Sequence, residues 1–158
     1  MNYLNRLTSL ATAGIRGFDF LSPAVDLAAR VWLANVFWKA GLTKTSSWDT
    51  TVMLFTYEYQ VPVLPPGMAA VLATVVELGG AVLLAAGLGG RVGAGALLIL
   101  NALAVISYPG LSAVGLKDHI FWGILLAIFL VHGPGRLSFD HYIRRRFMRD
   151  HGPLVDAR

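Results

Sequence analysis

The sequence predicts an all-α fold, an integral membrane bundle of four helices, from its composition and the spacing of its apolar segments. Of its 158 residues, 56% are hydrophobic and 14% are charged, whereas soluble domains average roughly 45–50% and about 25%. Four apolar segments, at about 23–42, 67–87, 91–109 and 116–133, have lengths within the roughly 17–25 residues that a transmembrane helix needs. We therefore expect residues 23–135 to form a bundle of four transmembrane helices in a lipid bilayer.

The segment before the first span, residues 1–22, is predicted to be an amphipathic helix in the membrane interface. Its apolar residues recur at helical spacing; they are Leu4, Leu7, Ala11, Ile15 and Phe18. The first span then begins with Pro23, a residue that helices tolerate in their first turn.

The connections between the spans differ in length. The second and third spans are joined by GLGG at 87–90, which permits only a tight turn, so their helices must be antiparallel neighbours. The connection between the first and second spans, residues 43–66, is the only long one. We expect an external loop whose aromatic residues lie at the membrane interface.

Basic residues are distributed unequally between the two sides of the membrane. With four spans, the side that holds both termini and the 87–90 turn carries nine of the 13 Lys and Arg residues, and the other side carries Lys44 and Lys117. Cytoplasmic segments carry such an excess, so we expect cytoplasmic termini and a basic cytoplasmic tail at 136–158. The net charge of +4 then suits anionic lipids better than nucleic acid.

Polar residues within the apolar segments are the candidate functional residues. Glu77 is central in the second span, Asn101 is near the centre of the third, and Arg30 lies at a similar depth in the first. A lone ion at mid-bilayer costs at least about 2.5–3.5 kcal/mol. We therefore expect these three residues, with Asn35, to converge on the bundle axis. Together with Lys39 they form the predicted binding site.

Other pairings of these residues stay open. Asp26 lies four residues before Arg30 and could neutralise it on one helix face. Glu77 would then pair with Lys39 or be protonated. Lys39, on nearly the opposite helix face from Arg30, could also extend toward the membrane surface. A purely structural role for the cluster, which would fix helix register, is a further alternative.

The sequence contains few residues suited to redox, metal-binding or catalytic chemistry. Cysteine is absent, which excludes thiol relays and clusters held by cysteine. Asp118 and His119 could bind a metal or relay a proton, but two ligands are too few for a typical site. No catalytic or phosphate-binding motif is present. We predict no catalytic residue, no metal site and no cofactor held by this chain alone.

Four stretches of the chain contain motifs in a characteristic order: RVWLANVFWKAGLTK, VPVLPPGMAAVLATVVELGGAVLLAAGLGGR, GAGALLILNALA and DHIFWGILLAIFLVHGPGRLSFDHYIRRR. With Arg30, a Gly-x-x-Lys pattern at Gly41 and Lys44, Glu77 followed by Gly79 and Gly80, and GPGRLSFD at 133–140, the chain resembles the DoxX family of small bacterial membrane proteins. The resemblance implies a four-helix bundle in the bacterial inner membrane.

The resemblance implies less about function. Some relatives look like the membrane subunit of thiosulfate:quinone oxidoreductase, others are associated with oxidative-stress complexes, and some appear alongside metal-handling proteins. Our leading hypothesis is a membrane subunit of a redox complex that binds quinone, anchors a catalytic partner or a second copy, and is not catalytic alone. The alternatives are a membrane scaffold or assembly factor without enzymatic activity, and a small oligomeric protein for solute or metal transport.

Overall fold

The protein is all-α in residues 3–150, the part of the chain that the computed structural model describes. The helices in chain order are α1 (Tyr3–Ser46), α2 (Trp48–Tyr57), α3 (Pro66–Ala86), α4 (Gly90–Ser107), α5 (Ala113–His132) and α6 (Phe139–Asp150). Four stretches are long and apolar enough to cross a membrane: Phe20–Ser46 of α1, and the whole of α3, α4 and α5. The predicted fold class and its four spans are confirmed, and the orientation of the termini stays a prediction.

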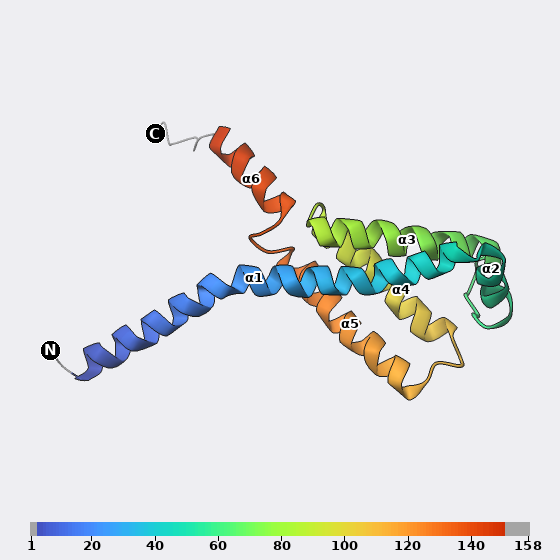
Figure 1. Cartoon of the computed structure of the whole chain (residues 1–158), viewed down its shortest axis with the longest axis horizontal. Coiled ribbons are helices and arrows are strands. Elements are labelled where there is room, and N and C mark those ends of the chain that lie inside the picture. The colour runs from blue at the N-terminus through green and yellow to red at the C-terminus, as the bar shows by residue number, and fades with distance from the viewer. Residues whose placement is uncertain (1–2, 151–158) are drawn as a thin grey trace, which may run out of the picture.

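The four spanning helices pack as a bundle (Figure 1) in which α1 contacts α3, α3 contacts α4, and α4 contacts α5. Aromatic pairs join α5 back to α1, with ring centroids 5.9 Å apart for Trp32 and Phe121 and 6.0 Å apart for Phe37 and Trp122. The buried core between the helices consists of Leu33, Ala34, Phe37, Ala81, Leu84, Ala94, Leu97, Leu126 and Phe129. Many other apolar side chains are exposed on the outer faces, as contact with a lipid bilayer requires.

A tight turn and a close helix contact join α3 to α4. Gly87 and Gly89 have φ angles of 65° and 54°, in the left-handed region that favours glycine. Where the two helices pack, a Cβ atom on Gly93 would lie 3.2 Å from the backbone oxygen of Gly80. Small residues at such positions let helix backbones approach closely. The predicted antiparallel pairing of these two helices is confirmed.

α1 is a single helix of 44 residues with Pro23 in its interior. The sequence predicted a separate interfacial helix over 1–22, whereas the described helix runs without interruption from residue 3 into the first span. Figure 1 shows the N-terminal half of α1 extending beyond the other helices and changing direction along its length. A proline inside a helix removes one hydrogen bond and kinks the axis, which accounts for a bend in this half.

The long connection after the first span is largely helical, which corrects the predicted loop over 43–66. α1 continues to Ser46, α2 follows almost at once, and only residues 58–65 are irregular. The hydroxyls of Thr43, Thr45 and Ser46 donate to backbone oxygens three or four residues earlier in α1. These bonds satisfy polar side chains within the helix, so the polar run that suggested a loop instead ends a helix.

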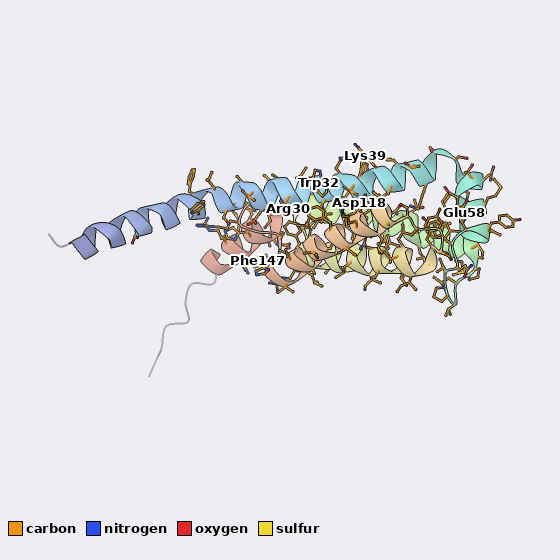
Figure 2. The ribbon with its side chains drawn as sticks, turned by 90° about the horizontal axis from the view of Figure 1, so that it is seen from below. Arg30, Trp32, Lys39, Glu58, Asp118 and Phe147 are labelled. Carbon is orange, nitrogen blue, oxygen red and sulfur yellow. The ribbon has the colours of Figure 1, made fainter. Side chains whose placement is uncertain are left out.

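α6 carries the beginning of the predicted basic tail and has two unlike faces. Phe139, Tyr142, Ile143 and Phe147 are exposed and recur at three- and four-residue spacing, whereas Asp140, His141 and the arginines occupy most of the remaining positions. A helix of this kind lies in the plane of a membrane interface. Figure 2 shows Phe147 and Glu58, which follows α2, at opposite ends of the bundle. The part of the predicted tail at 151–158 is outside the described residues.

Candidate functional site

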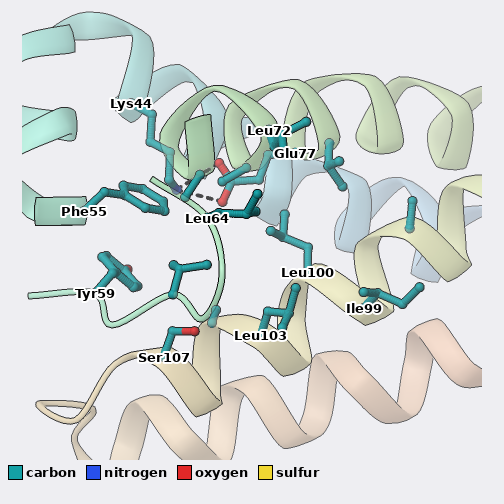
Figure 3. A pocket seen from close by; sticks show the side chains of 16 residues that line it. Lys44, Phe55, Tyr59, Leu64, Leu72, Glu77, Ile99, Leu100, Leu103 and Ser107 are labelled. Carbon is teal, nitrogen blue, oxygen red and sulfur yellow. Dashed lines mark hydrogen bonds and ion pairs between the residues drawn. The ribbon is translucent and has the colours of Figure 1, made fainter. Parts of the chain in front are cut away.

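An apolar cavity of 260 Å³ lies between α2, the connection 58–65, α3 and α4 (Figure 3). A cavity of about 150 Å³ is enough to hold benzene, so this one has room for a substituted six-membered ring. Most of its wall is apolar: Phe55, Val61, Leu64, Ala69, Leu72, Ala73, Val76, Ala96, Ile99, Leu100, Leu103 and Ala104. The polar lining residues are Lys44, Tyr59, Glu77 and Ser107.

An ion pair lies at the wall of this cavity. The Nζ atom of Lys44 on α1 donates to both carboxylate oxygens of Glu77 on α3, at 2.7 and 2.9 Å (Figure 3). The side chains are only 19% and 10% exposed. One turn earlier on α1, a Cβ atom on Gly41 would lie 3.3 Å from the Cβ atom of Glu77. The glycine therefore brings the two helices close enough for Lys44 to reach the carboxylate.

Ser107, at the end of α4, supplies an unpaired hydroxyl to the same cavity. The residue is 1% exposed, and its Oγ atom has no hydrogen-bond partner within the described part of the chain. Its backbone oxygen accepts a bond of 2.7 Å from the amide of Gln60, which ties the connection 58–65 to α4. A buried hydroxyl without a partner costs about 1–3 kcal/mol, so a ligand that bonded to this hydroxyl would be favoured.

Stacked aromatic rings close one side of the cavity. Phe55 stacks on Tyr59 with centroids 4.8 Å apart, and Tyr59 stacks on Tyr108 at 5.0 Å. Burial raises the pKa of Tyr59, and the negative charge of Glu77 raises this pKa further. A hydrogen bond to Glu58 raises the pKa of Tyr108. Both phenols are therefore protonated at neutral pH, and the Tyr59 hydroxyl is a donor beside the cavity.

Arg30, one of the predicted site residues, is buried at the other end of the bundle. It is 1% exposed and donates to the backbone oxygen of Pro134 and, at 2.7 Å, to that of Leu137. Its guanidinium lies level with Gly87, ten residues beyond Glu77 and hence about 15 Å along the axis of α3. The predicted convergence of Arg30 and Glu77 is therefore wrong. Lys44, which meets Glu77, lies 14 residues after Arg30 and hence about 21 Å farther along α1, so Arg30 cannot lie level with Glu77 as well.

Asn101, Asn35 and Lys39 also lie outside the cavity. Asn101 is buried and bonds to His119 on α5 twice, through the His119 backbone oxygen at 2.9 Å and its Nδ1 atom at 2.7 Å. Asn35 and Lys39 are exposed on α1, and Figure 2 shows Lys39 on the outer side of that helix. The structure thus does not bring these three residues together. A ligand-binding role for any of them stays a prediction.

Neither of the alternative pairings predicted for these charges is formed among the described residues. Within the described residues, Lys44 and Glu77 form the one ion pair, so neither Asp26 with Arg30 nor Lys39 with Glu77 forms one. The same residues contain no group of three or more acidic, histidine or cysteine side chains that could hold a metal ion.

Three residues of the site, Lys44, Tyr59 and Ser107, were not predicted from the sequence. The sequence predicts an external position for Lys44, and its only indication of a site is the Gly41-x-x-Lys44 spacing, which places both residues on one helix face. For Tyr59, as for the other aromatic residues of 43–66, the sequence predicts a position at the membrane interface. Ser107 carries no signal in the sequence, because only the fold shows that its hydroxyl is buried.

Comparison with known proteins identifies a family. A family model described as DoxX matches residues 25–110, which is more than half of the chain and includes every residue that lines the cavity. No curated protein and no solved structure matches the chain. Together with the four apolar helices, the family match makes this a multi-pass membrane protein. The chain belongs to the DoxX family.

Proposed function

We propose that this protein is a membrane subunit of a quinone-linked redox complex, and that the cavity beside Lys44 and Glu77 binds the quinone headgroup. The observation that supports the proposal is the cavity itself, an apolar space of ring size with hydrogen-bond donors at its wall. Ligand sites in proteins have this character, mostly apolar with a few placed polar groups. A quinone ring matches it, because its faces are apolar and its two carbonyl oxygens accept hydrogen bonds.

The polar groups have separate roles in this proposal. The ammonium of Lys44 and the hydroxyls of Tyr59 and Ser107 are donors for the carbonyl oxygens. Glu77 holds Lys44 in place through bonds to both carboxylate oxygens, and the pair is a route for protons when the quinone is reduced. Electrons come from a catalytic partner, and this chain binds and orients the ring.

The proposed location is the bacterial inner membrane with both termini in the cytoplasm. In that orientation α2 and the connection 58–65 face the outside, directly over the cavity. Exposed side chains there include Trp48 at 40%, Tyr57 at 81% and Val63 at 99%. An exposed aromatic and apolar surface beside a ligand site suits contact with a protein, so we propose it as the surface for the catalytic partner or a second copy.

A binding measurement tests the proposal. The full chain, purified in mild detergent, is titrated with a short-chain ubiquinone or menaquinone analogue in a calorimeter, against empty micelles. We expect saturable binding that Ser107→Ala and Glu77→Gln each weaken by roughly twofold to tenfold, the value of one hydrogen bond. Lys39→Gln, which changes an exposed lysine on the same helix as Lys44, is the matched control and should bind as the wild type does.

Two results would reject the proposed function. The first is binding no stronger than partitioning into empty micelles. The second is binding that Lys39→Gln weakens as much as the cavity variants do. Either result would favour the scaffold alternative.

A further inference from the structure

A second cavity, of 490 Å³, lies at the end of the bundle opposite α2, between the α3–α4 turn, the segment 133–138 and the start of α6. Three arginines from three different segments line it: Arg91 of α4, Arg136 of the connecting segment, and Arg144 of α6. We propose that this cavity, here called the basic cup, binds a phosphate group. The phosphate belongs either to the headgroup of an anionic phospholipid or to a soluble phosphate ester. The inference is independent of the proposed function.

The arginines of the basic cup have free donors. Within the described residues, neither Arg136 nor Arg144 forms an ion pair. Arg91 donates one bond of 3.1 Å to the backbone oxygen of Val131. A guanidinium has five N–H donors in a planar arrangement that binds phosphate through two parallel bonds. The three side chains therefore offer more charge-assisted bonds than the protein itself uses.

Two carboxylates, Asp26 and Asp140, also line the cup. Asp140 accepts from the backbone amides of Gly89 at 2.8 Å and of Gly90 at 3.0 Å, at the N-terminus of α4, where negative charge is stabilised by the helix dipole. Asp26 forms no ion pair within the described residues and lies on α1, one turn before the buried Arg30. Three arginines against two carboxylates leave the cup positive, and its two histidines, His132 and His141, add further donors.

The shape of the cup is set by the protein without a ligand. Gly133 and Gly135 have φ angles of 87° and 82°, which let the segment 133–138 turn sharply around the cavity. The buried side chain of Arg30 bonds to two backbone oxygens of this segment. A rim held in this way loses little conformational entropy when a ligand binds.

The location of the cup suits a lipid headgroup. It lies where α4 begins and α5 ends, at the level where the apolar spans stop and headgroups start. On α6, Asp140, His141 and Arg144 line the cup, whereas the exposed apolar residues Phe139 and Ile143 lie roughly 100° or more away around the helix from Arg144. A lipid phosphate in the cup would leave the apolar face of α6 among the acyl chains.

Thermal unfolding in neutral detergent tests the inference. The full chain is titrated in separate arms with phosphatidylglycerol, with phosphatidylcholine and with inorganic phosphate, and the apparent Tm is recorded. We expect a saturable rise in Tm with phosphatidylglycerol and none with phosphatidylcholine. A rise with phosphatidylglycerol alone identifies a lipid headgroup as the ligand. A rise with inorganic phosphate as well identifies the site as one that also takes soluble phosphate.

Matched variants distinguish binding in the basic cup from nonspecific attraction between basic residues and anions. Arg136→Gln/Arg144→Gln should weaken binding about tenfold or more, because charge-assisted bonds are lost. Arg145→Gln/Arg146→Gln also removes two positive charges, both at positions of α6 that do not line the cup. This control should weaken binding less than about threefold. Arg91→Gln is a second variant of the cup with the same expectation, should the double variant fold poorly.

The inference is overturned if neither phosphatidylglycerol nor inorganic phosphate raises Tm above the phosphatidylcholine arm. It is equally overturned if the Arg145→Gln/Arg146→Gln control weakens binding as much as the variants of the cup do.

Discussion

Removing the amine of Lys44 should destabilise the protein more than removing the charge of Glu77. Lys44→Met takes away the donor that lies 2.7 and 2.9 Å from the two carboxylate oxygens and leaves a carboxylate in an apolar cavity. Breaking a buried pair in this way costs about 3–5 kcal/mol. Because the side chains are 19% and 10% exposed, we expect the low end, about 3 kcal/mol. Glu77→Gln keeps an acceptor and lets the lysine extend toward the surface, so we expect about 1 kcal/mol.

The double variant Lys44→Met/Glu77→Gln measures the coupling energy between the two side chains. It has no unpaired charge, so it should be roughly 2 kcal/mol more stable than the sum of the single variants predicts, within the range of coupling for residues in contact. The free energy of unfolding is measured by SDS titration of the four proteins in mixed micelles. Lys39→Met, an exposed lysine of the same helix, is the control and should change stability by less than about 0.5 kcal/mol.

A coupling below about 0.5 kcal/mol would contradict a buried ion pair, because that is the value of an ion pair in water. The ion pair would then be accessible to solvent, and the cavity would not exclude water from it.

Two other contacts give predictions of their own. Arg30→Met should free the segment 133–138, whose backbone oxygens the guanidinium holds, and trypsin should cleave there at least about tenfold faster; an unchanged rate would show that other contacts hold the segment. Gly93→Ala places a Cβ atom 2.9 Å from the Cβ atom of Leu83 and should lower the free energy of unfolding by about 1–3 kcal/mol. Gly79→Ala has open space around its new Cβ atom and should change it by less than about 0.5 kcal/mol; equal effects would contradict the close packing of α3 and α4.

The number and approximate bounds of the spans could be predicted because they depend on local composition. An apolar segment of about 20 residues has one stable arrangement in a bilayer, a helix that satisfies its own backbone. The ends of the spans were less predictable. Thr43, Thr45 and Ser46 suggest a loop when only polarity is considered, yet each hydroxyl bonds back to its own helix.

The candidate site could be predicted only in part, because it depends on which helix ends meet. Glu77 was identified from its isolation in an apolar segment, which is a local feature. Its partner Lys44 was not, because the choice among Arg30, Lys39 and Lys44 depends on the relative depth of α1 and α3. A shift of a few residues in α1 changes that depth by a full helical turn. Here the offset is larger: Lys44 lies 14 residues after Arg30, about 21 Å farther along α1, so with Lys44 beside Glu77, Arg30 lies near Leu137.

The buried guanidinium on α1 has a consequence for biosynthesis. Its two acceptors lie 104 and 107 positions later in the polypeptide, and ribosomes make the chain from its N-terminus. The first span is therefore threaded into lipid before the carbonyls that stabilise its charge have been translated. Until then the nascent helix must keep that residue in contact with water or headgroups, so the bundle reaches its final depth only after the segment 133–138 has been translated.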